Sequence, residues 1–120
     1  MGAVTRAPVG VWRSLPETRQ MWQQAMQEVL AVARAHAVDL SDDIIARSTT
    51  YVEALAPYAT GSMQRDILAG LPSELGTLCG GVVRLGKAVG VPTPTHAFIY
   101  SVLLPQERKA RDEIDFPQGP

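Results

Sequence analysis

The sequence has few residues that form covalent or metal crosslinks and no excess of charge of either sign. Its 120 residues include one cysteine, Cys79, and two histidines. A single cysteine cannot form an internal disulfide or a four-cysteine zinc site. The formal net charge is −1, so the sequence lacks the basic patch that nucleic-acid binding requires. We therefore expect no nucleic-acid partner, no metal site and a reduced, cytoplasmic setting.

Long apolar runs are also missing. No stretch reaches the ~20 apolar residues that a membrane-spanning helix needs, and the first residues lack the apolar core of a signal peptide. No glycine-rich GxGxxG loop joins a strand to a helix, so we expect no dinucleotide site in this chain. These absences favour one small soluble domain that makes no membrane contact.

The sequence does contain a succession of helix signals. Apolar residues recur at intervals of three and four, which is the spacing of one buried face of a helix. The pattern predicts helices over residues 16–36, 41–56, 62–69, 73–89 and 94–104. No alternating pattern is long enough for a β-sheet, so we expect an all-α fold. We expect residues 1–13 to be an irregular lead-in, 14–104 the helical domain, and 105–120 a charged, partly disordered tail.

Two polar residues at predicted helix starts, Ser62 and Glu74, are candidates for a site. On spacing alone, Ser62 is a helix cap and Glu74 is a first-turn acid favoured by the helix dipole. Cys79 lies on an apolar helical face and is expected to be a small core residue. His96 is expected to be a surface or capping group, and His36 to lie at the negative end of the first helix.

Several short motifs occur in a fixed order from residue 62 onward. They are S-M-x-x-D at 62–66, G-L-P at 70–72, S-E-L at 73–75, G-G-V-V-R-L-G at 80–86 and G-V-P-T-P at 90–94. This order resembles the C-terminal domain of ketopantoate reductase (2-dehydropantoate 2-reductase). The resemblance spans about residues 6–104. It implies a helical bundle of that type, which is similar to the C-terminal domain of 6-phosphogluconate dehydrogenase.

The resemblance also implies roles for the two candidate residues. In the family, a serine at the position of Ser62 holds the keto acid, and a glutamate at the position of Glu74 lies beside the catalytic lysine and the substrate. Both are therefore implied as remnant substrate-binding residues, with Glu74 the remnant active-site acid. The family reduces 2-dehydropantoate or a similar 2-keto acid with NADPH, in the pantothenate pathway.

The family's layout places its Rossmann domain and catalytic lysine before Met1, with the first helix of the C-terminal domain truncated or absent here. The two lysines of this sequence, Lys87 and Lys109, match no catalytic position. We therefore expect this chain to bind no cofactor by itself and to be inactive alone. The resemblance implies the substrate-side domain of an NADPH-dependent oxidoreductase, with a separate Rossmann domain as its partner and a small keto acid as its ligand.

An alternative function belongs to a different class. The chain would then be a free-standing helical module for oligomerisation or partner binding, without enzymatic activity. Loss of the neighbouring helix and domain would bare apolar surface, so a homodimer is expected. Some positions also depart from the family pattern. Ala37 stands where relatives usually turn on glycine, Gly76 replaces an acidic residue, and asparagine is common at the positions of Cys79 and His96.

Overall fold

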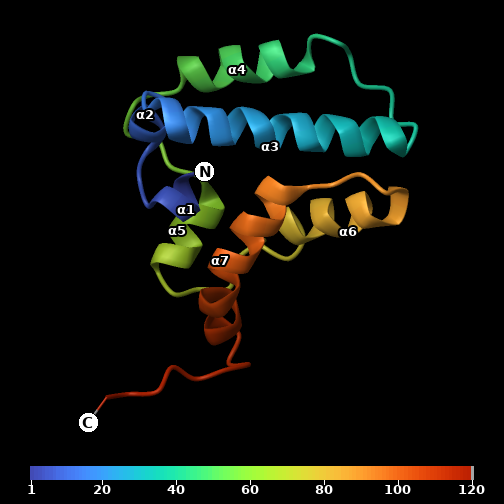
Figure 1. The fold of residues 1–120 in the computed structure, drawn as a ribbon. Coiled ribbons are helices and arrows are strands. Elements are labelled where there is room, and N and C mark those ends of the chain that lie inside the picture. Colours follow the sequence, from blue (N-terminus) through green and yellow to red (C-terminus); the bar gives the residue numbers. More distant parts are fainter. Residues whose placement is uncertain (120) are drawn as a thin grey trace.

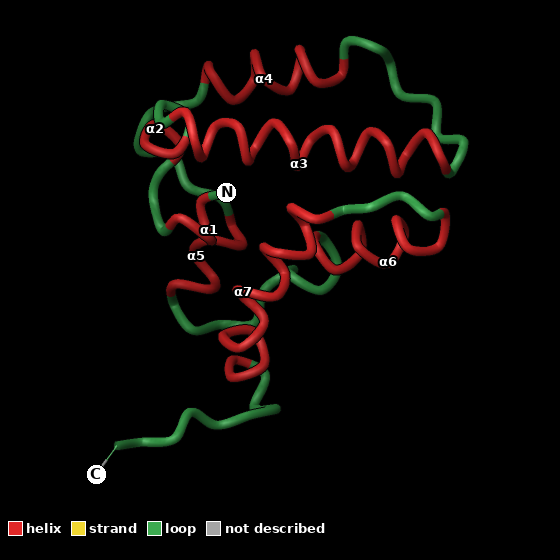
Figure 2. The backbone as a smooth tube through the Cα atoms, viewed as in Figure 1, coloured by secondary structure: helices red, strands yellow, loops and turns green. Residues whose placement is uncertain are grey.

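A computed structural model describes residues 1–119 as seven helices joined by loops, with no strand in that range. The helices are α1 (Gly2–Thr5), α2 (Val9–Trp12), α3 (Pro16–Ala35), α4 (Ile44–Ala54), α5 (Ser62–Leu68), α6 (Cys79–Val89) and α7 (Pro94–Ala110) (Figures 1 and 2). The all-α prediction is therefore confirmed. Within the described residues, no helix is both long enough and apolar enough to cross a bilayer.

The longest helix, α3, lies between two groups of elements. α4 runs along one side of it, and α6 and the start of α7 lie on the other side (Figure 1). The predicted helix over 16–36 agrees with α3 because its apolar stripe is long and regular. One group of buried residues joins α1, α6 and α7, and it includes Cys79, as expected. A second group forms where α2 meets α3.

Residues 1–13 are not an irregular lead-in. α1 packs against α5 and places Ala3 in the first core group, while α2 places Val9 and Trp12 in the second. The indole rings of Trp12 and Trp22 meet edge to face, with their centroids 5.5 Å apart, a geometry that aromatic pairs prefer. A helix of one turn is too short to show a period, so the sequence pattern gave no sign of these two helices.

The predicted start of α6 is wrong. We expected a helix from Ser73, but residues 74–78 form a bend and turns, and α6 begins at Cys79. The Ser73 hydroxyl accepts a hydrogen bond from the Leu75 N–H at 3.2 Å and donates one to the Glu107 carboxylate at 2.6 Å. Because Glu107 holds Ser73 from another helix, this serine shapes the turn and does not cap α6.

The predicted end of α7 is also wrong. α7 continues through Pro105 to Ala110, so the helical domain extends beyond residue 104 into the expected tail. Proline has no N–H and leaves one helical hydrogen bond unmade. The buried Glu107 carboxylate accepts hydrogen bonds from the Ser73 N–H at 3.0 and 3.1 Å. This tertiary contact holds the helix on the far side of the proline. The last residue of the expected tail, Pro120, lies outside the described residues.

α4 is loosely packed. None of its residues is buried. At one end, the Arg13 guanidinium donates hydrogen bonds to the carbonyl oxygens of Val52 and Leu55 at 2.7 and 2.9 Å. Before the other end, Arg34 of α3 pairs with the exposed Asp42 at 2.7 Å. α4 is thus fastened mainly near its two ends, and cavities remain between it and α3.

Candidate functional site

The two candidate residues from the sequence, Ser62 and Glu74, are both exposed. Ser62 is the first residue of α5, but Gly61 occupies the N-cap position and no side chain caps the helix. Glu74 lies in the bend before α6, so neither the capping role nor the first-turn role expected from spacing is observed. Within residues 1–119, neither side chain makes a hydrogen bond, which leaves both free to contact a ligand.

The cavities beside these two residues are separate. Gly61 and Met63, which flank Ser62, line a cavity of about 380 Å³ together with residues of α1 and α2. Ser73, which precedes Glu74, lines a cavity of about 240 Å³ against α7. Neither cavity brings Ser62 and Glu74 together.

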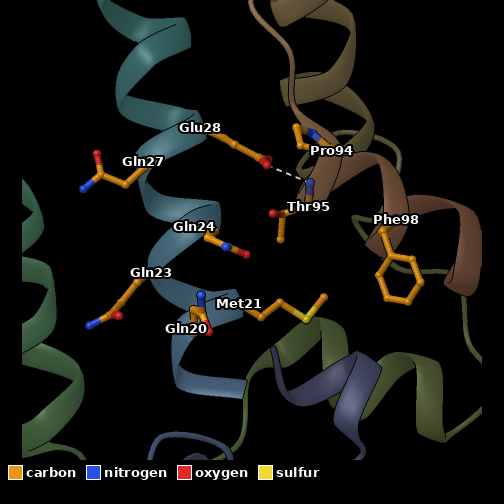
Figure 3. Close-up of a pocket in the computed structure, with 9 residues that line it drawn as sticks. All are labelled: Gln20, Met21, Gln23, Gln24, Gln27, Glu28, Pro94, Thr95 and Phe98. Carbon is orange, nitrogen blue, oxygen red and sulfur yellow. Dashed lines mark hydrogen bonds between the residues drawn. The ribbon is translucent and has the colours of Figure 1, made fainter. Parts of the chain in front are cut away.

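The structure instead shows a carboxylate site that sequence reasoning missed. The Glu28 carboxylate of α3 is buried and accepts hydrogen bonds from the Thr95 N–H at 2.7 Å and the His96 N–H at 3.0 Å. These N–H groups belong to the first turn of α7, where helical N–H groups have no partner within the helix. Thr93 occupies the N-cap position of α7, yet its side chain makes no capping hydrogen bond. Glu28 therefore caps α7 from a neighbouring helix (Figure 3).

The same carboxylate also binds the His96 side chain, with Nδ1 2.7 Å from Oε2. His96 is only 9% exposed, so the expectation of a surface residue is wrong. Burial raises the pKa of Glu28, but hydrogen bonds from the His96 side chain and from the Thr95 and His96 backbone outweigh it and hold the pKa below its ordinary value. Because the ionised carboxylate can only accept, Nδ1 carries the proton that joins them.

Glu28 forms one side of an open groove of about 670 Å³ between α3 and the start of α7. Met21, Gln24 and Glu28 point toward α7, whereas Gln23 and Gln27 point away from it (Figure 3). The amide groups of the glutamines can donate and accept hydrogen bonds. Glu28 is already occupied by three donors, and Met21, Pro94 and Phe98 also line the groove. The groove therefore combines apolar surface with glutamine amides, and its lining has no free acid or base.

A second buried carboxylate, Glu107, fixes the turn that carries Glu74. Besides Ser73, it accepts a hydrogen bond from Arg111 Nε at 2.7 Å, and Arg111 also donates to the Ser73 carbonyl oxygen at 2.9 Å. Burial raises the pKa of Glu107, but the hydrogen bonds from Ser73 and Arg111 and the charge of Arg111 together lower it below its ordinary value. Glu107 thus positions the backbone next to Glu74.

The sequence holds a signal for the burial of Glu28. The neighbouring glutamines Gln23, Gln24 and Gln27 favour the solvent side of α3. However, Met21, Ala25, Glu28 and Val32 are spaced by four, three and four residues, so they share one face of a helix. Since α3 is covered on two sides, this second face is partly buried as well, with Glu28 and Val32 its buried members. Among the described residues, no group of three histidine, cysteine or acidic side chains is placed to hold a metal ion.

Comparison with known proteins identifies the fold. The family model for ketopantoate reductase PanE/ApbA, C terminal, matches residues 1–107. The 2-dehydropantoate 2-reductase of Caulobacter vibrioides is 34% identical over 70% of this chain and 29% of its own length. That of Pyrobaculum aerophilum is 30% identical over 93% of this chain and 38% of its own length.

Solved structures agree with the family match. The PanE/ApbA family ketopantoate reductase of Ralstonia eutropha JMP134 superposes with a TM-score of 0.81 at 30% identity, covering 92% of this chain and 37% of the other. The dimeric ketopantoate reductase of Staphylococcus aureus shares the fold, with a TM-score of 0.84 at 24% identity over 91% of this chain and 38% of the other. The chain spans about a third of the length of these relatives. It belongs to the family of ketopantoate reductase C-terminal domains.

Proposed function

We propose that this chain is the substrate-side domain of a ketopantoate-reductase-like oxidoreductase that reduces 2-dehydropantoate or a similar 2-keto acid. The observation that carries this proposal is the family match over residues 1–107. Two further features support it. Ser62 at the start of α5 and Glu74 in the bend before α6 are both exposed, and their side chains have no hydrogen-bonding role within residues 1–119.

The proposal divides the chemistry between two domains. Reduction of a keto group needs a nicotinamide held against the carbonyl carbon and an acid that protonates the new alkoxide. A dinucleotide site uses a glycine-rich turn between a strand and a helix, and the described residues form helices and loops without a strand. These residues do not fit NADPH. We therefore assign NADPH to a Rossmann domain outside them, and contact with the keto acid to this chain.

Within this division, Ser62 would donate its hydroxyl hydrogen to a carboxylate or keto oxygen of the substrate. Glu74 would orient the substrate from the bend before α6. The rigid link from Ser73 to Glu107 would fix where Glu74 stands. The domain would act by holding the substrate, and we expect no oxidation of NADPH by this chain alone.

The test is an amide NMR titration of the chain with 2-dehydropantoate. We expect saturable shifts around residues 62 and 74. Ser62→Ala should weaken binding about 10- to 150-fold, because a hydrogen bond to a charged group is worth about 1.5–3 kcal/mol. Ser101→Ala is the matched control, since Ser101 is an exposed serine on α7, and it should bind as the wild type does.

Two results would overturn the proposal. If a folded sample showed no change of amide shifts on addition of 2-dehydropantoate, the chain would have no substrate site. Oxidation of NADPH by the chain alone, in the presence of 2-dehydropantoate, would contradict the division of chemistry between two domains. Restored turnover on adding a separately produced Rossmann domain would support that division directly.

A second candidate function is a helical module that forms a homo-oligomer or binds a protein partner. Large apolar side chains are exposed on both sides of the Ser73 turn, with Leu68, Leu71 and Leu78 each at least 50% exposed. Exposed apolar side chains of this size favour contact with another chain. Sedimentation equilibrium distinguishes the two. A stable dimer that Leu71→Lys dissociates, combined with a flat titration, would favour the module.

A further inference from the structure

A cavity between α3 and α4 has a mostly apolar lining. Its volume is about 230 Å³, and its apolar side chains include Met26, Leu30, Leu40, Ile44 and Ile45. Two polar groups also line it, Ser48 of α4 and His96 of α7. The cavity lies on the side of α3 that faces α4, whereas the groove of Figure 3 lies between α3 and α7.

The His96 side chain is held in one orientation. Nδ1 donates to Glu28, and the imidazole is 11% exposed. Nε2 has no hydrogen-bond partner within residues 1–119. Every completely buried side-chain nitrogen and oxygen in this part of the chain has a partner, so Nε2 must keep some accessible surface. His96 lines the cavity between α3 and α4, and we take this accessible surface of Nε2 to face the cavity.

The protonation of the ring follows from its partner. Glu28 is a carboxylate and can only accept, so the proton of a neutral imidazole sits on Nδ1. Nε2 is then an acceptor with a free lone pair. An acceptor with little exposure to water and no protein partner is unfavourable, because part of its hydrogen-bonding capacity is unmet. A ligand that brings a donor to Nε2 would remove that cost.

We propose that the cavity between α3 and α4 binds a small neutral molecule with a hydrocarbon body and one hydroxyl group, which donates to His96 Nε2. The apolar lining excludes a charged ligand, because burying a charge without a partner is costly. An apolar cavity of about 150 Å³ holds a molecule the size of benzene, so this cavity takes roughly seven to nine non-hydrogen atoms. The loose packing of α4, none of whose residues is buried, gives the ligand a way in.

This inference does not involve Ser62 or Glu74, and it stands whether or not the proposed function holds. The keto acid of the proposed function is charged and would be excluded from this cavity. The two sites are therefore separated by ligand charge as well as by position.

The test compares two probes of similar shape, cyclohexanol and cyclohexanone, by NMR titration of the full chain at about pH 8. Cyclohexanol can donate to Nε2, and cyclohexanone cannot. We expect cyclohexanol to shift the His96 Nε2 resonance and the methyl resonances of Leu40 and Ile45. We expect it to bind about two- to tenfold more tightly than cyclohexanone, which is the range for one net hydrogen bond.

Three variants locate the effect. His96→Asn keeps a donor for Glu28 but removes Nε2, so the preference for the alcohol should disappear. Ser48→Leu fills the cavity and should abolish binding of both probes. Thr50→Leu is the matched control, because Thr50 is exposed on the same helix, and it should leave both affinities unchanged.

Absence of saturable shifts around the cavity in the wild-type chain would overturn the proposal. So would equal affinities for the two probes, or a preference for the alcohol that persists in His96→Asn. The Nε2 resonance of the wild type reports contact with the alcohol directly, so the test does not depend on any variant being folded.

Discussion

The Glu28 carboxylate and the His96 imidazole meet at 2.7 Å, although the two residues are 68 positions apart in the chain. This contact joins the middle of α3 to the first turn of α7. The same carboxylate accepts the Thr95 and His96 N–H groups, so one side chain satisfies three donors. Removing a buried carboxylate that has several donors is costly, because each donor then has neither the carboxylate nor water as a hydrogen-bond partner.

The first prediction concerns Glu28 itself. Glu28→Ala should lower the free energy of unfolding by about 1–3 kcal/mol, the range for leaving buried hydrogen-bond donors without a partner. Glu28→Gln keeps one acceptor oxygen and should cost less. The measurement is urea denaturation followed by circular dichroism. Glu17→Gln is the control, since Glu17 is exposed at the start of the same helix, and it should change stability by less than about 0.5 kcal/mol.

A cost for Glu28→Ala no larger than that of the Glu17 control would contradict this account. It would mean that α7 begins as firmly without its cap. If Glu28→Ala kept the circular dichroism of the wild type but changed the NMR shift of the His96 imidazole, the effect would be confined to the contact between Glu28 and His96.

The second prediction is the direction of the acid dependence. Glu28 and Glu107 both have pKa values lowered from the ordinary value of 4.5. The unfolded chain therefore takes up protons at these groups at a higher pH than the folded chain does. Their contribution to stability is fully present above about pH 5 and is lost as the pH falls through the folded-state pKa values. The urea concentration at the midpoint of unfolding should therefore be lower at about pH 3.5 than at about pH 6.

The matched variant for this pH dependence is Glu28→Gln combined with Glu107→Gln. It should be less stable at about pH 6 and show a smaller loss on acidification, because neither amide titrates. An unchanged pH slope in the double variant would show that other carboxylates account for the acid sensitivity.

The fold was predictable wherever one pattern dominated. α3 followed from its apolar stripe, and Cys79 was placed correctly in the core. The errors arose where a distant residue decides the local structure. Serine is a common helix cap, but the Ser73 hydroxyl instead donates a hydrogen bond to Glu107, 34 positions away. The same contact carries α7 past Pro105. Such a contact leaves no trace in the spacing of nearby residues.

The candidate site was predictable in part. The motif order gave the family, and the structure confirms that Ser62 starts α5. Glu28 and His96 were missed for a physical reason. Sequence reasoning assumes that a charged residue on a helix faces water, and burial of Glu28 depends on N–H groups presented by α7. The contact with His96 depends on how α3 and α7 pack together, and no short stretch of the sequence includes both helices.

The third prediction tests close packing at two glycines of α6. A Cβ added to Gly86 would lie 2.7 Å from the Val91 carbonyl oxygen and 2.9 Å from the Thr93 methyl group. Gly86→Ala should therefore destabilise the chain by about 1–3 kcal/mol, as overpacking does. At Gly81 the nearest such atom is 4.0 Å away, in the flexible Arg84 side chain. Gly81→Ala should stabilise the chain by about 0.5–1 kcal/mol.

Thermal denaturation of both glycine variants checks this contrast. The two substitutions are chemically identical and lie five positions apart on one helix, so helix propensity acts equally on both. Equal effects of the same sign would show that α6 does not press against the Val91–Thr93 segment.

The last prediction concerns the end of α3. Ala37 has a φ of 58°, in the left-handed region, which costs a residue with a Cβ about 1–2 kcal/mol. The Val38 N–H bonds the Ala33 carbonyl oxygen at 2.9 Å, and the Ala37 N–H bonds that of Arg34 at 3.0 Å, a helix ending that favours glycine. Ala37→Gly should raise the free energy of unfolding by about 1 kcal/mol. Ala31→Gly, at an exposed position inside α3, should lower it by about as much. Urea denaturation measures both, and a loss of stability in Ala37→Gly would show that the chain does not turn here as described.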